Sequence, residues 1–331
     1  MSLTRRILLV ALTIFFTAQP LRMAEGVART AAGARLSLKL EMAVAAKQDQ
    51  VPGTTFPAKT EWATKMDAHF SYNGTKSGSC LQPVATVSFP LAKCTFGEKS
   101  SHRALYLLGD SQADQWLPAL DVWGIHKHWK VVVLTKASCR PWPSSRYMYW
   151  DYASEYPTCP QFNRWAIDQV NSNHPDIVLM TAQLGMLSPT TMETSSDVVS
   201  SIRRLKVMLQ PSKARLILMQ NIPWFWGPPA SPACLAAHLT NATSCAQPRV
   251  AGQGQFAVIN QAMATAIKQL ADQRIAPTLN VDDLVCSPTT CPMISGSILL
   301  YKDMAHLTRE WVQHVAPAFD ELLTPLASPG H

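Results

Sequence analysis

Short apolar runs alternate with amphipathic stretches along most of the chain. Five of these runs are short enough to be buried strands, and they span residues 104–108, 130–134, 176–181, 215–219 and 278–281. Between and after them, apolar residues at helical spacing predict helices over 112–123, 162–172, 196–209, 255–273 and 307–323. Strands that alternate with helices in this way predict an α/β fold, with a parallel five-stranded sheet between two layers of helices.

The first hundred residues follow a different pattern. Arg5 and Arg6 precede an apolar run at residues 7–18, which Gln19 and Pro20 end. This run has the length of a signal-peptide core and is short for a membrane-spanning helix. We expect residues 1–24 to be a signal peptide or a membrane anchor, 25–101 a linker and loop-rich extension, and 102–331 the folded domain. The alternative is a buried helix that opens a cytosolic domain.

The eight cysteines form four neighbouring couples along the sequence. An even number of cysteines in an exported chain predicts disulfides. We expect four bridges, which join Cys80 to Cys94, Cys139 to Cys159, Cys234 to Cys245, and Cys286 to Cys291. Zinc binding and thiol redox chemistry are the alternatives, but the chain has no C-x-x-C motif and no histidine at ligand spacing from a couple.

The net charge of the chain bears on which partners it can bind. The 331-residue chain has a formal net charge of +7, which favours anionic glycans, phospholipid head groups or nucleic acid as partners. The basic residues are scattered, and their longest clusters are the pairs Arg5-Arg6 and Arg203-Arg204. Because no basic stripe is present, we do not expect nucleic-acid binding.

The candidate catalytic residues lie in two segments that are far apart in the sequence. Ser111 follows Gly109 and Asp110 where the first predicted strand turns into a helix, and helix-terminal N–H groups at such a turn can stabilise an oxyanion. Ser111 and Asp110 are also ordinary helix-capping residues. Asp303 and His306 are three residues apart, so one turn of backbone can place the carboxylate beside the imidazole. These residues would supply a nucleophile, an orienting acid and a general base.

Four segments resemble, in the same order, the SGNH (GDSL-type) hydrolase superfamily; they are LLGDSQADQWLPAL, VVVLTKASCRPW, VDDLVCSPTTC and LYKDMAHLT. The likeness covers about residues 103–323 and is strongest to the extracytoplasmic SGNH domain associated with membrane acyltransferase-3 proteins, which O-acylate bacterial cell-surface polysaccharides. The resemblance implies a three-layer, flavodoxin-like fold. It also selects Asp303 as the triad acid over Asp282 and Asp283, which follow the last predicted strand.

The chain departs from the superfamily pattern at three positions. Gln112 stands where this branch often has a histidine after the serine. The superfamily completes its oxyanion hole with a Gly and an Asn at the ends of the next two strands, and neither is present here. Ser138 and Gln183 are the candidate replacements, because a hydroxyl, an amide or a backbone N–H can each donate a hydrogen bond.

The resemblance implies a serine-dependent acyl-ester hydrolase or O-acyltransferase that acts on cell-envelope polysaccharide or glycolipid outside the cytoplasm. No cofactor or metal is expected. Since the sequence shows one candidate membrane segment, acyl transfer would need a separate membrane acyltransferase-3 partner. The alternative is a non-catalytic glycan-binding domain that assists such an enzyme. Aromatic side chains in 139–160 and 223–253 would either stack on sugars or pack beneath the loops.

Overall fold

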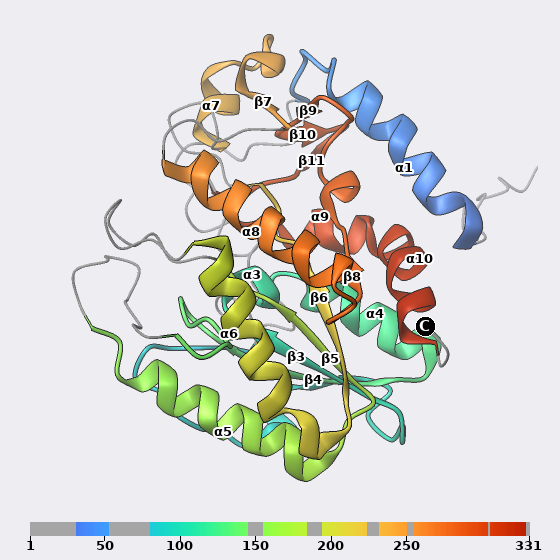
Figure 1. The fold of residues 1–331 in the computed structure, drawn as a ribbon. Coiled ribbons are helices and arrows are strands. Elements are labelled where there is room, and N and C mark those ends of the chain that lie inside the picture. Colours follow the sequence, from blue (N-terminus) through green and yellow to red (C-terminus); the bar gives the residue numbers. More distant parts are fainter. Residues whose placement is uncertain are drawn as a thin grey trace, which may run out of the picture.

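The computed structural model describes residues 31–52, 80–144, 155–183, 194–223, 232–249, 255–303 and 305–328. The predicted signal or anchor segment at 1–24 lies outside the described residues, as do most of the aromatic positions, at 145–154 and 224–231. The described chain folds around one central sheet that has helices on both faces (Figure 1).

Within the described residues the sheet has seven strands, and six of them follow the order β1-β4-β3-β5-β6-β8. The five predicted parallel strands all form, as β3 (Ala104–Gly109), β4 (Lys130–Lys136), β5 (Ile177–Thr181), β6 (Arg215–Met219) and β8 (Thr278–Leu279). Two strands from the predicted extension enlarge the sheet: β1 (Leu81–Gln82) pairs with β4 in parallel, and β2 (Thr95–Gly97) pairs with β4 antiparallel. Each is too short to produce a recognisable apolar run.

Strand β3 lies in the interior of the sheet and is buried along its whole length. Side chains alternate between the two faces of a strand. Leu105 and Leu107 therefore enter one apolar core, and Tyr106 and Leu108 enter the other. A parallel sheet covered on both faces has continuous apolar strands, which is the pattern that the sequence shows at 104–108.

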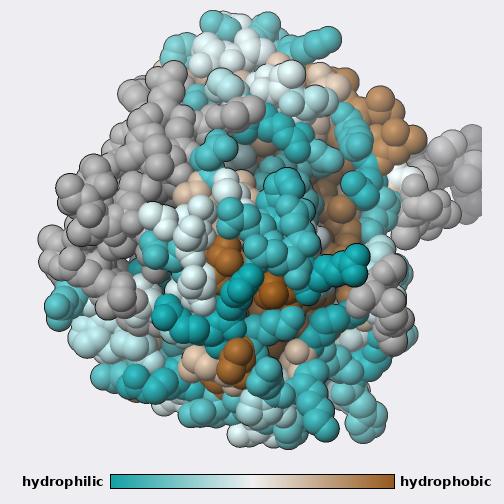
Figure 2. All heavy atoms as spheres, viewed as in Figure 1, coloured by the Kyte–Doolittle hydropathy of each residue, from teal (hydrophilic) through white to brown (hydrophobic). Residues whose placement is uncertain are grey.

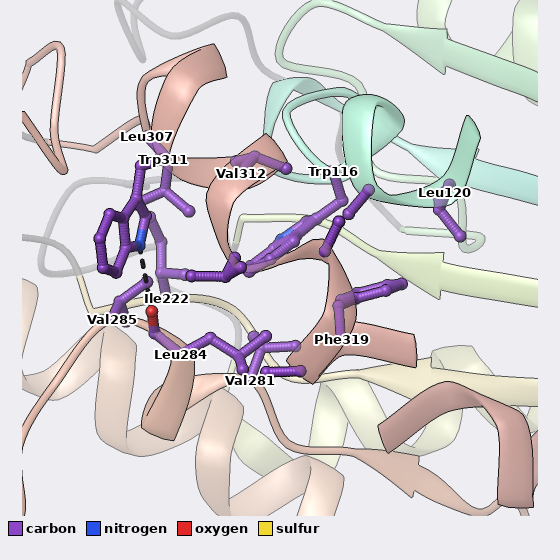
Figure 3. Close-up of a cluster of buried hydrophobic side chains, with 14 of the residues drawn as sticks. Trp116, Leu120, Ile222, Val281, Leu284, Val285, Leu307, Trp311, Val312 and Phe319 are labelled. Carbon is purple, nitrogen blue, oxygen red and sulfur yellow. Dashed lines mark hydrogen bonds between the residues drawn. The ribbon is translucent and has the colours of Figure 1, made fainter. Parts of the chain in front are cut away.

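The helices form two layers. One face is covered by α4 (Leu117–Lys127), α9 (Arg309–His314) and α10 (Ala316–Ala327), with α1 (Ala31–Ala45) packed against α10. The other face is covered by α5 (Thr158–Asn173), α6 (Ser195–Met208) and α8 (Gln255–Asp272). Aromatic rings fill the first core: Trp116 stacks on Phe319 with ring centroids 5.3 Å apart, and Trp311 Nε1 donates to the Leu284 carbonyl at 3.0 Å (Figure 3).

Two helices that were predicted as continuous are each divided in two. The first is interrupted between α3 (Ser111–Asp114) and α4 at residues 115–116, and the second between α9 and α10 at Val315. Pro118 and Pro317 each lie in the first turn of the second helix. Proline has no N–H to donate, so the first turn of a helix accommodates it without the loss of a hydrogen bond. The apolar spacing continues across both breaks, which is why it predicted single helices.

Four disulfides link the loops, and they join the four predicted couples. The remaining short elements are α7 (Pro232–Ala237), β7 (Gln247–Pro248), β9 (Thr290–Cys291), β10 (Ile294–Ser295), β11 (Ile298–Leu299) and the 3-10 turns η1 (Leu91–Cys94), η2 (Gln210–Ser212), η3 (Ala242–Cys245) and η4 (Asp282–Leu284). The pairing of β7 with β9 joins the insertion after β6 to the last part of the chain. Among the described residues, no helix has both the length and the apolar character required to cross a bilayer.

Candidate active site

Ser111 lies at the sharp turn between β3 and α3. Strand β3 ends at Gly109, Asp110 is the N-cap residue, and Ser111 is the first residue of the helix. A Cβ atom at Gly109 would lie 1.9 Å from the Thr181 carbonyl oxygen and 2.6 Å from the Ala113 Cβ. Only glycine therefore allows the close approach of β3, β5 and α3 that brings Ser111 to the carboxyl end of the sheet.

Asp110 links this turn to the neighbouring strand. Its Oδ1 accepts a hydrogen bond from Gln112 N at 2.8 Å, which is the capping role expected from the sequence. Its Oδ2 accepts a second bond, from Gln183 N at 2.9 Å, just beyond β5. Burial raises the pKa of Asp110 to about 6, although both backbone bonds and the nearby charges of His306 and Arg140 act to lower it. Asp110 is thus a buried bridge between the ends of β3 and β5.

The structure brings Ser111, His306 and Asp303 into one hydrogen-bonded row, although Ser111 and His306 are 195 positions apart. His306 Nε2 lies 2.8 Å from Ser111 Oγ, and His306 Nδ1 lies 3.0 Å from both carboxylate oxygens of Asp303. Asp303 Oδ1 also accepts the backbone N–H groups of Ala305 and His306, each at 2.8 Å. These bonds fix the carboxylate on the side of the imidazole that faces away from Ser111.

The electrostatics of Asp303 favour a permanent negative charge. Partial burial alone would raise its pKa, but the hydrogen bond and the charge of His306, the Ala305 N–H and the charge of Lys302 outweigh this effect. Together they lower the pKa of Asp303 to about 2. A carboxylate that stays ionised can orient the imidazole and stabilise its protonated form.

Two glutamines, one in α3 and one at its C-cap, hold the backbone on both sides of His306. Gln112 Nε2 donates to the Ala305 carbonyl at 2.8 Å, and Gln115 Oε1 accepts the N–H of Leu307 at 2.9 Å. Gln115 Nε2 also donates to the Gln112 side-chain oxygen at 3.1 Å, so the two amides orient each other. We call Gln112 and Gln115 the glutamine clamp. The sequence showed Gln112 as a departure at this position, but it gave no sign of the contact with Ala305.

Asp114 is another buried carboxyl group near this row. Its Oδ1 accepts a hydrogen bond from Thr135 Oγ1 of β4 at 2.8 Å. Burial raises its pKa to about 6, while the Thr135 bond and the charges of Lys302 and His306 act to lower it. Asp114 therefore links the end of α3 to the carboxyl end of β4.

The alternative triad acids have other partners. Asp282 Oδ2 accepts a hydrogen bond from Gln220 Nε2 at 2.9 Å, and Asp283 Oδ1 pairs with an Arg249 guanidinium nitrogen at 2.7 Å. Both contacts join the end of the last strand to the segments after β6. The carboxylate beside His306 is therefore that of Asp303.

The two candidate oxyanion donors follow the strands on either side of β3. Ser138 lies two residues after β4, and its φ of 54° places it in the left-handed region. Gln183 lies two residues after β5; its backbone N–H is used by Asp110, and its Oε1 accepts Asn221 Nδ2 at 3.2 Å. Asn221 also donates to the Ala182 carbonyl at 2.7 Å. The hydrogen bond to Oε1 leaves the side-chain N–H₂ of Gln183 as the donor that it can offer.

The expectation that no histidine lies at ligand spacing from a cysteine couple is wrong for one set of side chains in the described part of the chain. It consists of Cys234, His238 and Cys245, whose ligand atoms all lie within 4.8 Å of one another. The two cysteines are joined in a disulfide, so neither is a thiolate that can bind zinc. His238 Nδ1 lies 2.9 Å from the Cys234 carbonyl oxygen. As it stands, this cluster is a disulfide with a neighbouring histidine.

A parallel α/β sheet that presents serine, histidine and aspartate at the carboxyl end of its strands is the architecture of enzymes that transfer acyl groups from esters. The chain belongs to the family described as "SGNH domain (fused to AT3 domains)", whose model matches residues 79–321. The predicted family and the predicted class, an SGNH-type enzyme that acts on ester bonds, are confirmed. The match begins before the expected residue 103, so it includes β1 and β2.

Several solved structures match the chain, with different degrees of similarity. The periplasmic domain of the Salmonella ser. Paratyphi A lipopolysaccharide acetyltransferase has a TM-score of 0.52 at 12% identity, over 78% of this chain and 94% of that one. The acetyl xylan esterase AlAXEase has a TM-score of 0.42 at 13% identity, over 67% and 99% of the two chains. The M. smegmatis aryl esterase has a TM-score of 0.43 at 12% identity, over 68% and 99%. No curated protein sequence matches the chain.

Proposed function

We propose that this protein is a serine-dependent acyl-ester hydrolase or O-acyltransferase that acts on cell-envelope carbohydrate through Ser111, His306 and Asp303. The observation that carries this function is the 2.8 Å contact of Ser111 Oγ with His306 Nε2, with Asp303 on the opposite ring nitrogen. This is the order of groups that activates a serine hydroxyl for attack on a carbonyl.

The reaction proceeds in two acyl-transfer steps. His306 Nε2 takes the Ser111 proton as Oγ attacks the carbonyl of an ester or thioester, and Asp303 stabilises the imidazolium. The Ser111 N–H, together with Ser138 or the Gln183 amide, donates to the tetrahedral oxyanion. His306 then protonates the leaving alcohol or thiol, which leaves an acyl ester on Ser111. Attack by water gives hydrolysis, and attack by a sugar hydroxyl gives an O-acylated glycan; in both cases His306 accepts the incoming proton.

The family and one structural relative support the proposed substrate and partner. The family model is that of a domain fused to acyltransferase-3 domains, and a similar structure is the periplasmic domain of a lipopolysaccharide acetyltransferase. We infer an acylated polysaccharide or glycolipid as substrate and a separate membrane acyltransferase-3 protein as the acyl donor. Acyl transfer by the purified chain from a soluble donor would show that the separate partner is not needed.

The proposed organisation keeps residues 1–24 as a signal peptide or membrane anchor, 25–101 as linker and extension, and 102–331 as the catalytic domain. Four disulfides in the described chain support an oxidising, extracytoplasmic location, because cytosolic thiols are normally kept reduced. Mass determination of the exported protein would tell cleavage after the first segment from retention of an anchor.

A purified full-length chain tests the catalytic function directly. We expect the wild type to hydrolyse p-nitrophenyl acetate and to react with a fluorophosphonate probe. Ser111→Ala should abolish labelling, and His306→Ala should lower turnover by about 10²–10⁴-fold. His126→Ala is the matched control, since this histidine lies on α4 with a side chain 68% exposed, and it should behave as the wild type. Labelling that persists in Ser111→Ala would contradict the assignment.

A glycan-binding function without catalysis is the second candidate. It is favoured by the missing Gly and Asn at the usual oxyanion positions. A folded wild-type chain that neither turns over nor reacts with the probe, and that binds acylated glycans as well as Ser111→Ala does, would select this function.

A further inference from the structure

Helix α1 is apolar on two opposite sides, and only one of them is covered. The covered side packs against α10 and consists of Ala34, Leu38, Met42 and Ala45. On the opposite side Leu36, Leu40 and Val44 are 65%, 65% and 71% exposed. We call these three side chains, which follow one another at every fourth residue, the outer face of α1. Figure 2 shows hydrophobic side chains gathered at the upper right, where α1 lies in Figure 1.

The outer face is presented by a helix that is firmly held. The Glu321 carboxylate of α10 accepts the N–H groups of Ala34 and Arg35, at 2.7 and 3.1 Å, near the start of α1. Beyond the other end, the Gln48 side chain forms two bonds of 2.8 Å to the backbone of Gly296. A contiguous apolar patch that is left exposed on a rigid element commonly marks an interaction site. The exposure of this face therefore calls for a partner outside the described chain.

The charges that border this face are mostly basic: Arg35 and Lys39 lie on α1 and Lys47 just beyond it, while the acid Asp49 further on accepts a hydrogen bond from Thr243 Oγ1. Lys39 lies one turn after Leu36, and Lys47 lies three residues beyond Val44; both are exposed, and neither has an ion pair within the described part of the chain. The acid of the helix, Glu41, is turned inward, where it accepts hydrogen bonds from Ser295 Oγ at 2.7 Å and His314 Nε2 at 2.9 Å. Apolar side chains bordered by lysines are typical of helices that lie on anionic lipid.

We propose that the outer face of α1 docks on the surface of an anionic phospholipid bilayer. Leu36, Leu40 and Val44 would enter the boundary between head groups and acyl chains, and the two lysines would pair with phosphates. The length of chain in front of α1 fits this partner. The apolar run at 7–18 ends twelve residues before α1, and twelve residues reach at most about 40 Å. A membrane anchor there would hold α1 within reach of the surface.

A second copy of the chain is a poorer fit to this face. Stable protein interfaces bury roughly 800 Å² on each partner and have cores depleted of charge. Three side chains beside two lysines supply much less apolar area than this. They suit weak membrane contact, which adds to the affinity of another membrane-binding segment. The inference concerns where the domain is held, and it stands whether or not Ser111 is catalytic.

Hydroxyl-radical footprinting of the full-length chain tests the contact itself. Vesicles of phosphatidylethanolamine with phosphatidylglycerol should reduce oxidation of Leu36, Leu40 and Val44 severalfold. Val122 and Ile125 of α4, which are 46% and 57% exposed, are the internal controls and should be oxidised at an unchanged rate. Because the readout is confined to individual side chains, insertion of residues 1–24 into the same vesicles cannot produce it by itself.

Charge and self-association are tested in the same assay. Lys39→Glu with Lys47→Glu should remove most of the protection, whereas Val122→Ser with Ile125→Ser should leave it intact. Unchanged oxidation of the outer face on adding anionic vesicles would overturn the proposal, and equal protection by phosphatidylcholine alone would overturn the choice of an anionic surface. Protection without vesicles that grows with protein concentration would identify a second copy as the partner and also overturn it.

Discussion

At the residue scale, the position of His306 depends on amide side chains as well as on its carboxylate partner. The glutamine clamp grips the backbone at Ala305 and Leu307, while Asp303 holds the imidazole itself. An acyl-transfer base must be within hydrogen-bond reach of the serine, and a displacement of 1 Å can cost about 10²-fold in rate. For the proposed base His306, Gln112 and Gln115 would thus be positioning residues, which act on catalysis through it.

Substitutions of similar size separate the two members of the clamp. Gln112→Glu removes the donor to the Ala305 carbonyl and brings a negative charge towards that oxygen, so we expect kcat to fall by about 10²-fold with little change in KM. Gln115→Glu keeps an oxygen that accepts the Leu307 N–H, so its kcat should fall much less. Steady-state kinetics with p-nitrophenyl acetate measures both.

Two results would argue against a positioning role for the clamp. One is a loss of stability in Gln112→Glu, seen by urea unfolding, while the folded fraction keeps wild-type kcat. The other is an equal loss of kcat in both glutamate variants. The first result would make Gln112 a packing residue of α3, and the second would mean that its bond to the Ala305 carbonyl is not what positions His306.

Asp303 should make stability depend on pH in the acidic range. Its pKa is about 2 in the folded protein against an ordinary value of 3.8, so between these values the unfolded chain binds more protons. The stabilisation is complete above about pH 4 and is lost as the pH falls through 2. Since the side chain is 45% exposed, solvent screening limits the contribution to about 1 kcal/mol.

Asp303→Asn isolates this contribution. In urea unfolding at pH 6, we expect the variant to be less stable than the wild type by about 1 kcal/mol. The difference should shrink as the pH is lowered towards 2, because the wild-type carboxylate becomes protonated. A difference that stays constant over this range would mean that the ionised carboxylate contributes no charge-dependent stability.

At the element scale, the features that could be predicted were those that depend on residues close together in the sequence. The five parallel strands were visible because a strand buried on both faces is a continuous apolar run. The contact of Asp303 with His306 was visible because three residues fit within one turn of backbone. Strands β1 and β2 were missed since they are two and three residues long and owe their conformation to β4.

The hydrogen bonds between strand ends could not be predicted from the sequence. Asp110 binds Gln183 N because β3 and β5 are neighbours in the sheet, and the sequence does not give the order of strands. The bond from Asn221 to Gln183 likewise depends on β6 lying beside β5. A candidate site assembled from strand ends can therefore be predicted in its residue types, while the hydrogen bonds that orient it need the sheet topology.

At the scale of the whole molecule, a buried lysine fastens the N-terminal extension to the catalytic sheet. Lys136, the last residue of β4, is fully buried, and its Nζ donates to the carbonyl oxygens of Pro83 at 3.0 Å, Val84 at 2.6 Å and Thr86. The segment that it binds follows β1 directly. Since Ser138 and Asp114 adjoin the same end of β4, this attachment also shapes one border of the candidate active site.

Lys136→Met should therefore weaken both the fold and the site. The methionine fills a similar volume but leaves three carbonyl groups without their shared donor, which should lower the free energy of unfolding by about 3 kcal/mol. Lys130→Met is the matched control at the other end of β4: its side chain is half-buried, and the substitution should change stability by less than about 0.5 kcal/mol. Urea unfolding measures both variants, and limited proteolysis should cut the Lys136→Met chain faster near residues 83–86. The two variants could instead prove equally stable in urea and equally resistant to proteolysis. In that case the extension is held by its β-pairing and the Cys80–Cys94 disulfide, and Lys136 does not shape that border of the candidate active site.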